Sequence, residues 1–161
     1  MALTFTWTDV GSQIMGILND TTYLPDPWED ATSKERENWW HDDIPKMTAQ
    51  YPRGVVYFDG DDDIDKSYGT NFITTNKESF VIYFYTKEDF IYEDELGVQY
   101  KNQALVRYFL RRVFNVLKKT QIINKYHISN KQSITVLPPA IGENINIWVG
   151  EMVIDFFKRN D

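Results

Sequence analysis

Five aspartates between residues 59 and 65 are the side chains whose types and spacing come closest to a chemical site. They are Asp59, Asp61, Asp62, Asp63 and Asp65. Oxygen-rich clusters can bind Ca²⁺ or Mg²⁺, but this one does not fit an EF-hand, because Lys66 stands where that loop needs a glycine. We therefore interpret it as an acidic loop kept extended by self-repulsion, or as a charged surface that faces another subunit or holds off a polyanion.

Other catalytic chemistry has little support in the sequence. There is no cysteine, and the two histidines, His41 and His127, are too few for a zinc site. The G-x-S-x-G elbow, the H-E-x-x-H motif, the P-loop and the dinucleotide fingerprint are all missing. Glu93 and Glu95 suit glycoside hydrolysis only if a cleft separates them, and the sequence does not set that distance. We expect a protein that is not an enzyme and has no metal or other cofactor.

The segment 101–119 carries a second candidate site, because all of its charged residues are basic. They are Lys101, Arg107, Arg111, Arg112, Lys118 and Lys119. A helix of this kind cannot neutralise itself through i,i+4 pairs. Three interpretations remain open: a solvated face whose last lysines complement the helix dipole, a surface that pairs with acidic residues of a neighbouring copy, and a nucleic-acid site. The subunit or partner interface that we predict uses Arg107, Arg111, Arg112 and Lys119.

Residues 20–50 form the third candidate, an arm or long inserted loop rich in proline and charge. It contains three tryptophans, Trp28, Trp39 and Trp40, which argue against simple disorder. Large aromatic residues in a polar arm either cover the chain's own core or anchor a partner. We keep both interpretations and include the three tryptophans in the predicted interface.

The whole chain has the size and composition of one domain. It has 161 residues, of which 42% are hydrophobic, and a formal net charge of −7, which does not favour nucleic acid or an anionic membrane. Residues 1–65 hold 4 basic and 14 acidic side chains, whereas residues 66–161 hold 13 and 10. The start of the chain does not resemble a signal peptide, and no apolar run is long enough to cross a bilayer. We expect a protein that is used without export and does not contact membranes.

The elements that must position these residues are indicated by hydrophobic periodicity and turn residues. We expect helices at 9–18 and 101–119, and strands at 53–58, 71–75, 79–86, 133–137 and 145–157. A turn is expected at Asn76-Lys77, and a bulge at Gly150 in the last strand. The predicted fold is α+β, with a mainly antiparallel sheet of four to five strands packed against two helices and an extended arm after the first helix.

This succession of features resembles the tail terminator and tail completion proteins of long-tailed viruses of bacteria and archaea. The resemblance rests on the order of the elements: the first helix, the Tyr51-Pro52 step before a strand, the strand at 80–85, the helix at 101–119 and the C-terminal strands. Two features depart from the family pattern, the arm at 20–50 and the charged stretch at 87–100.

The resemblance implies a mechanical role in the virion. Such proteins form a ring, typically of six copies, at the head–tail junction, where they end polymerisation of the tail tube and leave a channel for DNA. The implied partners are further copies of the chain, the tail tube protein, a head connector or completion protein, and DNA that passes without specific binding. The acidic loop would then line the lumen or meet the basic helix of the next subunit. The implied location is the tail or neck of the virion, after synthesis in the host cytoplasm. The alternative is a small acidic adaptor or immunity-type protein that binds one partner through its aromatic arm.

Overall fold

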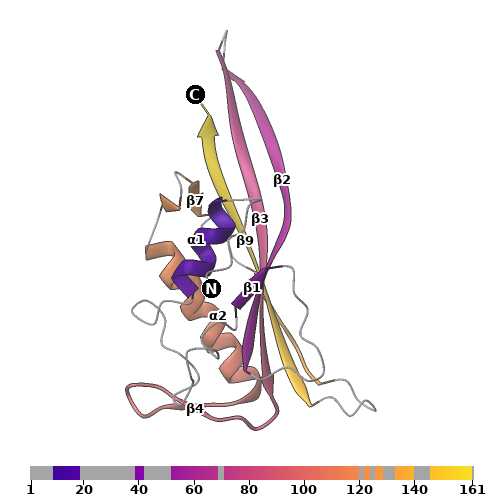
Figure 1. Cartoon of the computed structure of the whole chain (residues 1–161), viewed down its shortest axis with the longest axis vertical. Helices are drawn as coiled ribbons and strands as arrows, with labels where there is room; N and C mark the ends of the chain where they lie inside the picture. The colour runs from indigo at the N-terminus through magenta and orange to yellow at the C-terminus, as the bar shows by residue number, and fades with distance from the viewer. Residues whose placement is uncertain are drawn as a thin grey trace.

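The computed structural model describes residues 9–18, 39–41, 52–68, 71–119, 122–123, 126–128, 133–139 and 146–160. In this part of the chain, two helices lie on one face of a twisted, mainly antiparallel sheet (Figure 1). The helices are α1 (Asp9–Leu18) and α2 (Asn102–Lys119). The predicted α+β class, with an antiparallel sheet packed against two helices, is confirmed.

The sheet is built around two long strands. Its members are β1 (Trp39–His41), β2 (Arg53–Tyr68), β3 (Asn71–Lys87), β6 (Ile122–Ile123), β7 (Tyr126–Ile128), β8 (Ser133–Leu137) and β9 (Ile147–Asn160). β3 lies between β2 and β9, and β1 extends the edge of β2 as a parallel strand. β8 and β7 follow one another along the other edge of β9, and β6 pairs with β7. A separate small hairpin joins β4 (Tyr92–Glu93) to β5 (Gln99–Tyr100).

The core lies between the helices and the sheet. Alternate residues of β3 and β9 turn toward the helices, and Phe80, Ile82 and Phe84 are fully buried there. The buried stripe of α2 recurs at helical spacing and includes Leu105, Phe109 and Val113, as the sequence predicted. Phe84 and Phe109 stack with ring centroids 4.4 Å apart. This packing fixes which face of α2 is left for solvent.

Gly150 has a different role from the bulge that was predicted. The register of β9 is continuous across it, with Phe84 of β3 on one side and Val136 of β8 on the other. A Cβ atom at this position would overlap the side chain of Val106 and come within 2.7 Å of Leu110 Cδ1. Glycine is therefore needed so that α2 can approach the sheet closely.

The acidic segment is a strand and not the loop that was predicted. Residues 59–65 belong to β2 and pair with β3, which runs without a break through the expected turn at Asn76-Lys77. The pairing helps to explain this, because Lys77 of β3 is the register partner of Asp62. The register shifts only between Phe58 and Gly60. The outer part of this long hairpin extends beyond both helices (Figure 1).

The predicted arm is described only in part. Its residues Trp39–His41 form β1, so their backbone belongs to the sheet. The rest of the arm, including Trp28, lies outside the described residues.

Candidate functional site

A hollow on the outer face of α2 is the best candidate for a binding site, and we call it the basic groove. It has a volume of about 570 Å³. It is lined by Tyr100, Ala104, Arg107, Tyr108, Arg111, Arg112, Asn115, Val116 and Lys119. The structure thus brings together all four basic residues of α2 that the sequence placed in an interface.

Helical periodicity explains why these side chains meet. Arg107 and Arg111 are four residues apart, and Arg112 and Lys119 are seven apart, so each pair lies on one side of the helix. The apolar stripe of α2 is held against the sheet, which turns the basic residues outward. The groove is therefore a consequence of the same pattern that buries the core.

Most of the positive charge in the groove is unpaired. Arg112 has partners: its guanidinium donates a hydrogen bond of 2.5 Å to the Tyr108 hydroxyl and lies 3.8 Å from the exposed carboxylate of Glu95. Within the part of the chain that the structure describes, Arg107, Arg111 and Lys119 have no ion-pair partner. An anionic partner can approach these three cations without displacing an existing contact.

Tyrosines form one wall of the groove. Tyr100 stacks on Tyr108 with centroids 4.0 Å apart, and the Tyr100 hydroxyl donates to Asp94 Oδ2 at 3.3 Å. Loss of solvation, followed by the negative charge of Asp94, raises the pKa of Tyr100 above its usual value. Tyr100 is therefore neutral near pH 7 and does not cancel the positive charge beside it.

The turn between β4 and β5 carries an exposed apolar tip beside this wall. The Asp94 carboxylate accepts hydrogen bonds from the backbone N–H groups of Leu96 and Val98, both at 2.9 Å. Gly97 has a φ of 78°, which glycine adopts without strain. Leu96 is 88% exposed on this well-bonded turn. Ile91 and Val98 nearby are also exposed, so the turn presents a small apolar patch and not a single leucine.

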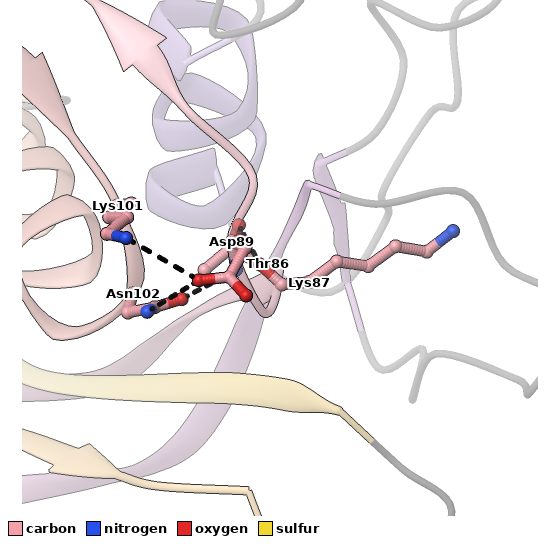
Figure 2. Close-up of polar contacts among 5 residues, drawn as sticks. All are labelled: Thr86, Lys87, Asp89, Lys101 and Asn102. Carbon is pink, nitrogen blue, oxygen red and sulfur yellow. Dashed lines mark hydrogen bonds and ion pairs between the residues drawn. The ribbon is translucent and has the colours of Figure 1, made fainter.

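Polar contacts between Asp89, Lys101 and Asn102, which we call the clamp, join the two ends of the segment that carries the tip. The Asp89 backbone N–H donates to Asn102 Oδ1 at 2.8 Å, and Asn102 Nδ2 donates to Asp89 Oδ1 at 3.4 Å (Figure 2). Lys101 Nζ lies 3.7 Å from the same carboxylate oxygen, whereas the Lys87 side chain points away (Figure 2). The clamp ties the end of β3 to the start of α2 and so fixes the β4–β5 hairpin relative to the groove.

The face of the sheet that points away from the helices is a second exposed surface, which we call the open sheet face. Tyr57, Leu137 and Val153 are each at least 40% exposed there. Val81, which lies between Tyr57 and Val153 in the sheet, is buried. Glu151 lies opposite Tyr83 in the sheet. Partial burial, followed by the negative charges of Glu151 and Asp59, raises the pKa of Tyr83. This surface is therefore both aromatic and acidic.

Little in the described part of the chain suggests catalysis or metal binding. No three histidine, aspartate or glutamate side chains gather there as a metal site. Glu93 and Glu95 are both exposed, and neither lines the groove. Among the described residues, no helix is long and apolar enough to span a membrane.

The side chains of most other predicted interface residues lie outside the described part of the structure. Trp39 and Trp40 lie in β1, and of Asp61, Asp62, Asp63 and Asp65 the structure describes only the backbone, within β2. Sequence reasoning missed the tyrosine wall, the Leu96 tip and the open sheet face. The spacing of Tyr108 and Arg112, four residues apart in α2, was a signal for the first of these.

Comparison of the sequence with protein-family models and with curated proteins finds no match.

Proposed function

We propose that the protein is a ring-forming structural protein of a virus tail, of the tail terminator kind, which closes the end of the tail tube at the head–tail junction. Its partners would be further copies of itself, the tail tube protein and a head connector or completion protein. DNA would pass through the ring without specific binding. The proposal starts from the resemblance in element order and from the α+β fold that the resemblance implies.

The basic groove is the observation that carries the proposal. Arg107, Arg111 and Lys119 are exposed and have no ion-pair partner among the described residues, on a chain whose net charge is −7. A second copy carries more acidic than basic side chains, and a local cationic groove favours one orientation of contact with it. Copies that associate through two unlike surfaces form closed rings when the rotation between them closes.

The long β2–β3 hairpin adds a second feature suited to a ring. It extends past the helices and carries the five aspartates of the acidic segment (Figure 1). A hairpin of this charge at the rim of a channel would repel the phosphates of passing DNA.

The test is the state of assembly of the purified protein. Negative-stain electron microscopy with multi-angle light scattering, at low salt and several concentrations, should find rings with a central hole. A ring of about six copies is the expected result. A monomer at every concentration, both alone and with a tail tube protein, would reject the proposal.

No observation in the described part of the arm favours the alternative of an adaptor. Trp39 and Trp40 have their backbone in an edge strand of this chain's own sheet. A one-to-one complex with an unlike protein, without self-association, would nevertheless point to that alternative.

A further inference from the structure

The exposed apolar residues of the described chain fall into two groups on opposite sides of the molecule. Ile91, Leu96 and Val98 lie on or next to the β4–β5 hairpin, on the helix side of the sheet (Figure 1). The second group is Tyr57, Leu137 and Val153 on the open sheet face. Neither group is large enough to mark a hydrophobic core, but each is suited to contact with another protein surface.

The charged residues of these two sides also differ. The apolar tip adjoins the basic groove, because Glu95 of the tip contacts Arg112 and Tyr100 at the end of β5 lines the hollow. The open sheet face instead carries the carboxylates of Asp59 and Glu151. Within the described residues, neither carboxylate has an ion-pair partner. The surface of α2 is thus cationic, beside a tip that carries Leu96 together with the exposed carboxylates of Glu93 and Glu95. The open sheet face carries Asp59 and Glu151 with aromatic and aliphatic residues.

We infer that the open sheet face of one copy is covered by the basic groove and the Leu96 tip of the next copy. The inference rests on the proposed function, and it names the contact from which the ring is built. Arg107 and Arg111 would lie against Asp59 and Glu151 of the neighbour, while Leu96 would pack among its exposed apolar residues. The occupant of the sheet face is a second copy because this chain itself presents a surface complementary to it in both charge and apolarity.

The position of the two surfaces determines the kind of assembly. They lie on opposite sides of a two-layer molecule, so one copy can use both at once, with a different neighbour at each. A contact between two unlike surfaces is heterologous, and it forms a ring or a filament according to the rotation between copies. In a symmetric dimer each copy contributes the same patch, so the groove of one copy would not have to meet the open sheet face of the other.

Charge reversal on each side separately gives a sharp test. The groove variant is Arg107→Glu with Arg111→Glu, and the sheet variant is Asp59→Arg with Glu151→Arg. Alone, each should assemble at least about tenfold more weakly than wild type, because its two surfaces now carry the same sign of charge. Lys118→Glu, compared with Arg111→Glu alone, is the matched control for the groove variant, since Lys118 is exposed on the same helix and lies outside the groove.

An equimolar mixture of the two variants is the decisive sample. The reversed groove then meets the reversed sheet face, and the native groove meets the native sheet face, so every contact in an alternating assembly is complementary. Light scattering and electron microscopy should therefore find assembly restored, with equal amounts of the two variants in each particle. Circular dichroism checks that each variant folds. If Glu151→Arg disturbs folding, Thr135→Arg replaces it, because Thr135 is exposed and pairs with Glu151 in the sheet.

The outcomes separate this inference from the proposed function. Rings of the sheet variant that match wild type would overturn the inference and leave the ring in place, with the acidic hairpin as the next surface to examine. Two defective variants that stay apart when mixed would also overturn it. Filaments of wild type that the mixture restores would support the contact and reject the ring. A wild-type protein that never self-associates would reject both.

Discussion

At the scale of single residues, Gly150 decides how closely α2 packs on the sheet. We predict that Gly150→Ala lowers the free energy of unfolding by about 1–3 kcal/mol, because the new methyl group overlaps Val106 and Leu110. Denaturant unfolding followed by fluorescence measures the change. Combining Gly150→Ala with Val106→Ala should recover part of the loss, since the second change removes the atoms that clash. A fully stable Gly150→Ala protein would contradict the close approach.

Gly16 supplies the matched control for that substitution. It is exposed in α1, and a Cβ atom there would meet nothing within 4 Å. Gly16→Ala should therefore stabilise the protein, by about 0.5–1 kcal/mol, through the lower helix propensity of glycine. The same unfolding assay should give opposite signs for the two glycines, although the chemical change is identical.

The raised pKa of Tyr92 lets us predict how the free energy of unfolding responds to alkaline pH. Burial, followed by interaction with Tyr108, raises the pKa of Tyr92 above its usual value near 10, although Arg112 opposes the shift and Asp94 and Glu95 reinforce it. The folded state therefore holds this proton more tightly than the unfolded state. The resulting stability is fully present below pH 10 and is lost as the pH rises through the folded pKa.

Comparison with Tyr92→Phe isolates this contribution from the lysines that titrate in the same range. Unfolding free energies at several pH values between 8 and 11 should fall less steeply above pH 10 for Tyr92→Phe than for wild type. Parallel curves would show that Tyr92 titrates alike in both states.

At the scale of elements, the clamp between β3 and α2 sets the position of the β4–β5 hairpin. Asp89 and Asn102 have φ values of 61° and 53°, a left-handed conformation that aspartate and asparagine tolerate better than most residues. We predict that Asn102→Ala lowers the unfolding free energy by about 2–3 kcal/mol, from backbone strain together with the lost hydrogen bonds. Asn102→Gly loses only the hydrogen bonds and should cost about 1 kcal/mol. Equal losses for alanine and glycine would show that the backbone is not strained.

The same elements show how far the fold could be predicted from the sequence. α1, α2, β8 and the inner part of β9 follow from apolar spacing, because each buries one face against a neighbour. The strand at 71–75 was predicted, but the outer half of β2 was missed and a turn was expected at Asn76-Lys77, since aspartate and asparagine disfavour strands in isolation and the pairing of β3 with β9 joins segments far apart in the chain. The parallel pairing of β1 has no local signal at all.

The candidate site was likewise predictable from the sequence only in part. The four basic residues of the groove could be predicted, because helical spacing alone places them together. The open sheet face could not, since it is made by residues of β2, β3, β8 and β9 whose alignment depends on tertiary pairing. Leu96 was indicated only as part of a turn with Gly97, and its exposure depends on the hydrogen bonds of Asp94.

At the scale of the whole molecule, charge is organised by face rather than by position in the chain. The sequence has an acidic first part and a slightly basic second part, but the sheet mixes them, because β2 pairs with β3 and β3 pairs with β9. Asp59 and Glu151 come from different parts of the chain and act on the same tyrosine, Tyr83. For the self-contact that we propose, the relevant polarity is the one between the groove and the open sheet face.

This polarity predicts that the charged and apolar parts of the self-contact respond differently to salt. Exposed ion pairs contribute about 0.2–1 kcal/mol each and weaken as the Debye length falls below about 10 Å, whereas burial of an apolar side chain does not. Replacing Arg107 and Arg111 by alanine should therefore flatten the dependence of the association constant on salt. Leu96→Ala should lower the association constant at every salt concentration and leave that dependence unchanged.

Sedimentation velocity between about 50 and 500 mM NaCl measures both effects, a range over which screening by salt becomes strong. The control is a matched pair of single variants, Lys118→Ala against Arg111→Ala, which lower the net charge by the same one unit and of which only Arg111 lines the groove. Long-range repulsion between acidic copies then changes equally in the arginine variant and the lysine variant, so a difference in their salt dependence reports the groove itself. If the arginine variant and the lysine control behave alike, net charge alone governs association and the groove makes no specific contact. If only the arginine variant loses its salt dependence, the cations of α2 meet carboxylates in the assembled protein.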